Sequence, residues 1–141
     1  MTTNVLQDGI SVSRNINATN PEVEISGSRD ALVRLASAFD GTRNVVSIPL
    51  AERQSKFYPK ALELLVVVCD ESRSSDLVNV QMIESRIEFS GAKSALLMIC
   101  DSLVNVFEAS CEAGEHFHLD YYPGNQVLEE TPISLIFMCS E

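Results

Sequence analysis

The residues of this sequence that are best suited to form a chemical site are two histidines. His116 and His118 are the only histidines in the 141 residues, and they lie two apart in a stretch that we expect to form a strand. Side chains alternate along a strand, so His116, His118, Asp120 and Tyr122 are predicted on one face. Two imidazoles and a carboxylate are transition-metal ligands, with Cys111 as a candidate fourth. A polar strand face open to water or to a partner explains the same pattern. We favour that interpretation because no third ligand follows at a fixed spacing.

The motifs of common enzyme mechanisms are missing from the sequence. It has no GxSxG element for a nucleophile and no glycine-rich phosphate-binding pattern. Paired carboxylates such as Glu129 and Glu130 fall in predicted turns, where exposure to solvent makes general acid catalysis improbable. The four cysteines are scattered without a CxxC spacing, and we expect them to be reduced thiols. The sequence therefore predicts neither an enzyme nor a bound cofactor.

The charge of the chain limits its partners. Twenty acidic residues against ten basic ones give a formal net charge of −10. Such a field repels nucleic acids and anionic lipids, and it attracts a basic protein surface. Solubility alone also explains an acidic composition. The longest apolar run, Leu64 to Cys69, is too short to span a bilayer, and the first eight residues lack the pattern of a secretory signal. We therefore expect a cytoplasmic protein.

Carboxylates gather in the second half of the chain, around the predicted histidine strand. Tyrosines lie among them, and carboxylates around tyrosines suit an interface with a basic protein. An ordinary solvated acidic edge is the alternative. The short basic and aromatic stretch from Ser55 to Lys60 is predicted to be a loop. The predicted partner-binding residues are Glu112, Glu115, His116, His118, Asp120, Tyr122, Glu129 and Glu130.

Self-comparison of the chain predicts an internal duplication. Residues 24–27 (Glu-Ile-Ser-Gly) match residues 88–91 (Glu-Phe-Ser-Gly), and apolar positions at helical spacing follow both. Each copy is predicted as a β-α-β-β unit, which gives an α+β domain whose mostly antiparallel sheet has both helices on one face. The predicted segments are an N-terminal arm or hairpin (1–20), a first repeat (21–71), a linker or strand (72–85) and a second repeat (86–141).

The strands and helices that build the two units can be located in the sequence. Val23 to Ser26 and Arg86 to Ser90 are the first strands, and each ends at a Ser-Gly corner. A helix follows in each unit, with Ser28 predicted to cap the first. In the N-terminal arm, Asp8-Gly9 is a typical hairpin turn. The expected helices are 29–39 and 92–107, and the expected later strands are 44–50, 63–69, 116–122 and 133–139.

A pattern in the second half resembles a known bacterial family. It consists of residues 114–120 (Gly-Glu-His-Phe-His-Leu-Asp), Leu128 and residues 132–137 (Pro-Ile-Ser-Leu-Ile-Phe), with residues 87–91 upstream. In these positions the chain is similar to small immunity proteins of polymorphic toxin systems, of the type called immunity protein 32. The resemblance covers mainly residues 86–139. It implies a protein that neutralises a cognate toxin domain, usually by covering its active site.

Three functional hypotheses follow for this chain. The preferred one is an immunity or antitoxin-like protein, a monomer or homodimer, whose acidic surface occludes the basic site of a toxin. The second is a small metal- or ligand-binding protein that uses His116, His118, Asp120 and Cys111. The third is a structural subunit that dimerises through its sheet edges.

Overall fold

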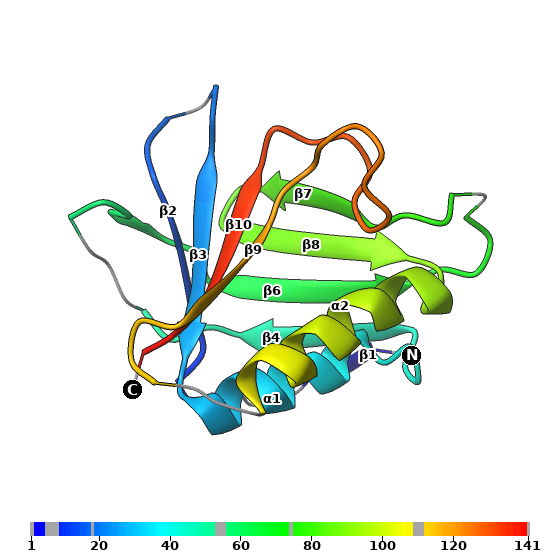
Figure 1. The fold of residues 1–141 in the computed structure, drawn as a ribbon, viewed down its shortest axis with the longest axis horizontal. Helices are drawn as coiled ribbons and strands as arrows, with labels where there is room; N and C mark the ends of the chain where they lie inside the picture. Colours follow the sequence, from blue (N-terminus) through cyan, green and yellow to red (C-terminus); the bar gives the residue numbers. More distant parts are fainter. Residues whose placement is uncertain are drawn as a thin grey trace.

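The chain folds into two five-stranded mixed sheets and two α-helices that lie across them (Figure 1). The computed structural model describes residues 2–4, 9–17, 19–52, 56–73, 75–108 and 112–140. Most neighbouring strands run antiparallel, and the α+β class predicted from the sequence is confirmed.

The first sheet has the strand order β1-β4-β6-β8-β7. Its strands are β1 (Thr2–Asn4), β4 (Val45–Pro49), β6 (Leu64–Cys69), β7 (Asn79–Ile83) and β8 (Arg86–Gly91). The second sheet has the order β5-β2-β3-β10-β9. Its strands are β2 (Ser11–Arg14), β3 (Glu22–Gly27), β5 (Lys60–Ala61), β9 (His116–Leu119) and β10 (Ser134–Cys139).

The expectation of one continuous sheet was wrong. The last strand of each half pairs in parallel with the first strand of the other half: β6 with β8, and β10 with β3. Each pairing builds its own sheet, so strands from both halves contribute to both sheets. The N-terminal arm or hairpin stays a prediction; of the strands near it, β1 and β2 lie in different sheets. Asp8 of its predicted turn lies outside the described residues.

Both sheets use the same pairing register. Ser134 of β10 lies opposite Glu22 of β3, and Leu64 of β6 lies opposite Arg86 of β8. β4 and β9 correspond as well, because β4 pairs with β6 in the antiparallel sense, as β9 does with β10. The four-strand pattern β4-β6-β8-β7 therefore has its counterpart in β9-β10-β3-β2. An ancestral duplication of the two halves stays a prediction.

The helices form where apolar residues recur at helical spacing, and their ends are capped in different ways. Ser28 caps α1 (Arg29–Ala36), as predicted, by accepting the N–H of Ala31. A short 3-10 turn, η1 (Ser37–Phe39), extends it. The residue before α2 (Lys93–Phe107) is Ala92, which offers no side-chain cap. Glu71 takes this role, because its Oε1 accepts the N–H of Lys93 at 2.6 Å.

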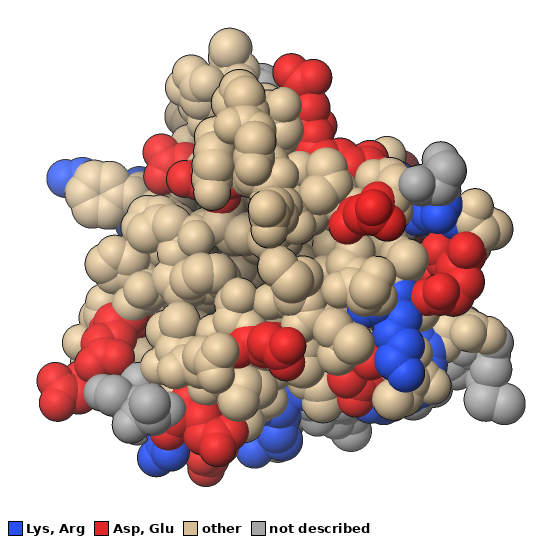
Figure 2. All heavy atoms as spheres, turned by 45° about the vertical axis from the view of Figure 1, so that its right-hand side comes forward, with Lys and Arg blue, Asp and Glu red and all other residues tan. Residues whose placement is uncertain are grey.

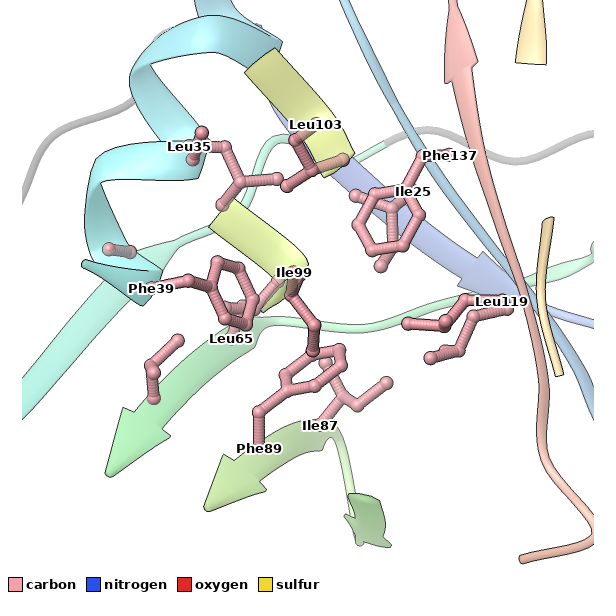
Figure 3. Packing of buried hydrophobic residues seen from close by; sticks show 14 of the residues in the cluster. Ile25, Leu35, Phe39, Leu65, Ile87, Phe89, Ile99, Leu103, Leu119 and Phe137 are labelled. Carbon is pink, nitrogen blue, oxygen red and sulfur yellow. The ribbon is translucent and has the colours of Figure 1, made fainter. Parts of the chain in front are cut away.

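One apolar core joins the helices to both sheets (Figure 3). Leu35 and Leu103 face it from the two helices, while Phe89 and Phe137 enter it from the first and second sheet. Phe39 meets Phe89 edge to face, with ring centroids 5.1 Å apart. Each such buried side chain contributes roughly 1.5–3 kcal/mol to folding. The core thus fixes the position of the second sheet, including β9.

Candidate partner-binding surface

β9 presents its two histidines to solvent. His116 and His118 are exposed and their rings meet edge to face, with centroids 4.9 Å apart. Phe117 points the other way and packs against Phe137, while Leu119 is buried. The alternation predicted for this strand is therefore confirmed. It holds because one face of β9 covers the core and the other does not.

The histidine strand ends earlier than predicted, and a hollow lies at its end. The strand stops at Leu119, so Asp120 and Tyr122 belong to the following loop. Asp120 accepts a hydrogen bond from the hydroxyl of Ser134 on β10, and Tyr122 is 61% exposed. The hollow has a volume of about 250 Å³. It is lined by Ser102, Phe117, His118, Leu119, Asp120, Tyr122, Asn125, Gln126 and Val127.

The metal hypothesis gains nothing from the geometry. No three His, Cys, Asp or Glu side chains converge on a metal position within the described part of the chain. Nδ1 of His116 lies 3.1 Å from the carbonyl oxygen of Gly114, so the backbone already engages this ring. The candidate ligand Cys111 lies outside the described residues. What the structure supports for His116 and His118 is a polar strand face open to solvent.

Glu129 differs from the other acidic residues of the predicted surface. Its carboxylate pairs with Arg73 at 2.7 Å and accepts a hydrogen bond from Asn79 at 3.2 Å. Burial alone raises the pKa of Glu129, but the hydrogen bonds from Arg73, Ser75 and Asn79 outweigh it. The pKa therefore lies below its ordinary value of 4.5. Glu129 holds the loop before β10 against the first sheet, and its charge is already compensated.

The remaining predicted glutamates lie at separate places around β9. Glu112 and Glu130 are exposed, whereas Glu115 is half-buried. The backbone carbonyl of Glu115 accepts the N–H of Cys139 at 2.8 Å. Carboxylates occupy several separate positions on the face drawn in Figure 2, with basic side chains between some of them. The negative charge is thus spread over that face rather than concentrated in one patch.

The cysteines differ from the expectation of four reduced thiols. Cys139 is disulfide-bonded, so the expectation is wrong for this residue, which is fully buried in β10. Cys69 and Cys100 are free. Burial, together with the nearby carboxylates Glu71 and Asp101 respectively, raises the pKa of both thiols and disfavours the reactive thiolate.

An aromatic pair that consists of an exposed Phe57 and a half-buried Tyr58 was not expected as a surface feature from the sequence. Phe57 is 75% exposed, and the hydroxyl of Tyr58 donates to Glu22 Oε1 at 3.3 Å. Burial and the charges of Glu22 and Glu24 raise the pKa of Tyr58. Both aromatic residues lie in the stretch predicted as a loop, beside the start of β3. Their signal in the sequence was an adjacent Phe-Tyr pair flanked by lysines.

The chain was compared with known proteins by sequence and by structure. Among the described helices, none has the length and apolar character required to cross a membrane. A comparison with curated protein sequences found no match. Among solved structures, the chain is similar to the crystal structure of Drosophila Suppressor of Fused, with 15% identity and a TM-score of 0.46. That alignment covers 92% of this chain but only 27% of the other.

The family comparison agrees with the pattern around β9. The model of a family described as Immunity protein 32 matches residues 22–44 and 86–139, which together make up more than half of the chain. The matched segments contain β3, α1, β8 and α2, together with the histidine strand and β10. On this match, the chain belongs to the Immunity protein 32 family.

Proposed function

We propose that this chain binds a cognate bacterial toxin domain in the cytoplasm and neutralises it by occluding its active site. The observation that carries the proposal is membership of the Immunity protein 32 family. An immunity protein acts by binding, and the chain has no motif of a catalytic site in its sequence. We therefore propose no reaction and no cofactor for it.

The surface around β9 is the part of the molecule that we propose for toxin binding. It combines the exposed rings of His116 and His118 with the exposed aromatic ring of Tyr122 beside a hollow. Buried tyrosines and desolvated pockets carry much of the energy at protein interfaces. The exposed carboxylates of Glu112 and Glu130 favour a toxin with a basic surface, because opposite charges speed the encounter.

Co-expression tests the proposal directly. The chain is produced together with the product of its neighbouring reading frame, purified by a tag on one of them, and the mass of the complex is measured. We expect a tight 1:1 complex that protects cells from that product. A product that remains toxic and does not co-purify with the chain contradicts the proposed function.

The contribution of the exposed carboxylates near β9 to toxin binding is tested by a matched pair of variants. Glu112→Gln with Glu130→Gln removes two exposed charges near β9, and Glu52→Gln with Glu84→Gln removes two exposed charges elsewhere. Both variants have the same net charge, so long-range attraction changes similarly in each. We expect the first pair to weaken binding roughly tenfold at low salt and to flatten the salt dependence. Equal effects of the two pairs would refute the acidic contribution at this surface.

A further inference from the structure

β9 is an edge strand whose outward backbone groups are arranged to accept another strand. It is last in the order of its sheet, with β10 on one side and no described strand on the other. The N–H of Cys139 donates to the carbonyl of Glu115 at 2.8 Å. Because hydrogen-bonded pairs alternate in an antiparallel ladder, Phe117 and Leu119 also exchange bonds with β10. The backbone groups of His116 and His118 therefore point to the open edge.

The corresponding edge in the first sheet is occupied. β4 pairs with β6 in the same register, and the N–H of Cys69 donates to the carbonyl of Asn44 at 2.8 Å. Val45 and Ser47 thus occupy the positions of His116 and His118, with their backbone groups pointing away from β6. On that side lies β1, a parallel strand that pairs with β4 from Val45 to Ser47. In the first sheet, therefore, the edge that corresponds to the open edge of β9 accepts a parallel strand.

We propose that the open edge of β9 binds an extended segment of the toxin as a parallel strand, in the register that β1 adopts on β4. This inference rests on the proposed function. A toxin residue opposite Phe117 donates its N–H to the carbonyl of His116 and accepts the N–H of His118. Addition of a strand to an exposed sheet edge is an established mode of peptide recognition.

The core-facing side of β9 indicates which type of side chain suits the toxin residue that lies opposite Phe117. Side chains of paired residues lie on the same face of a sheet, so the residue opposite Phe117 points toward the hollow at the end of β9. Asp120 and Tyr122 line that hollow together with Phe117. A lysine or arginine fits this lining, because its stem packs on the rings while its charge meets the carboxylate of Asp120. The net charge of −10 also favours a basic segment of another protein over a second copy of this chain.

Amide hydrogen exchange measures the proposed strand directly. The probe is the toxin domain from the neighbouring reading frame, co-purified with the chain, and exchange is followed for each residue by NMR. In the free chain, the amide of His118 should exchange fast and that of Phe117 slowly, since only Phe117 donates to β10. In the complex, the amide of His118 should become at least about tenfold slower. A complex in which His118 still exchanges fast overturns the strand proposal while leaving the proposed function intact, whereas the absence of a complex overturns both.

A pair of substitutions at one position separates the backbone contribution from that of the imidazole. His118→Pro removes the outward N–H at a position where an edge strand tolerates proline, and His118→Ala removes the ring but keeps the N–H. We expect the proline variant to bind at least about tenfold more weakly than the alanine variant, with similar melting temperatures for both. Equal binding by the two variants contradicts strand addition. A free chain that is dimeric, with the amide of His118 already slow, shows that a second copy occupies the edge and also overturns the proposal.

Discussion

At the scale of residues, the structure separates two acidic side chains that are adjacent in the sequence. Glu130 is exposed, whereas Glu129 is tied to Arg73 and Asn79. Sequence patterns place both in one turn and do not distinguish them. The difference arises because the loop before β10 meets the first sheet, where the N–H of Val78 donates to the carbonyl of Val127 at 2.7 Å.

Glu129→Gln should destabilise the fold by about 1 kcal/mol near neutral pH, because it removes a partly buried ion pair. The pKa of Glu129 is lowered in the folded chain. The stabilisation that Glu129 contributes is therefore present in full above 4.5, its pKa in the unfolded chain. It is lost as the pH falls through the lower pKa of the folded chain. Denaturant unfolding at neutral pH and at acidic pH checks this. The difference between the variant and the parent chain should vanish in acid, and Glu130→Gln serves as the exposed control. A Glu129→Gln variant as stable as the Glu130→Gln variant at neutral pH would contradict the assignment.

At the scale of elements, the helices are positioned by groups from outside their own segments. Arg29, at the start of α1, donates to the carbonyl of Glu108 just beyond the end of α2. This contact compensates an unpaired carbonyl at the end of α2 and places the two helices side by side in opposite directions (Figure 1). The start of α2 depends in the same way on Glu71, in the turn after β6.

Glu71→Ala should cost about 1 kcal/mol, as expected for loss of a helix cap, because the N–H of Lys93 then loses its acceptor. Ser28→Ala at the start of α1 is the positive control, since there the cap is a residue adjacent to the helix. Urea unfolding of both variants gives the comparison. A Glu71→Ala variant as stable as the parent chain would show that water replaces this carboxylate at no cost.

At the scale of the whole molecule, the exchange of strands between the halves makes each half depend on the other. β6 has its parallel neighbour β8 in the second half, and β10 has its parallel neighbour β3 in the first. A half on its own would leave these strands without one neighbour and would expose the apolar face that the core covers. Unpaired strand edges and uncovered apolar surface both oppose folding of the isolated half.

Residues 1–71 and 72–141, produced separately, should therefore each lack cooperative unfolding and should regain it when mixed. Circular dichroism of each fragment and of the equimolar mixture, followed through a thermal melt, makes this comparison. Two fragments that each melt cooperatively would show that the halves are independent domains.

The sequence alone determined both helices, the strands of the two predicted β-α-β-β units and the family. Apolar spacing placed both helices and the strands of the two predicted units. The pattern of residues 114–120, Leu128 and residues 132–137, with residues 87–91 upstream, indicated the immunity protein family. The alternation of side chains also placed His116 and His118 on the same side of their strand, which is the solvent side. These features follow from local periodicity, which a single sequence records directly.

Only the tertiary structure decided how the strands are shared between the sheets. Pairing of β6 with β8 and of β10 with β3 joins distant segments, and an apolar strand has the same pattern whichever neighbour it takes. For the same reason, the sequence did not reveal that Glu129 is neutralised by Arg73. Nor did it reveal that β4 has an added strand at its edge while β9 has none among the described residues. Strand order is a property of non-local contacts, and it is strand order that leaves the backbone of His116 and His118 open to a partner.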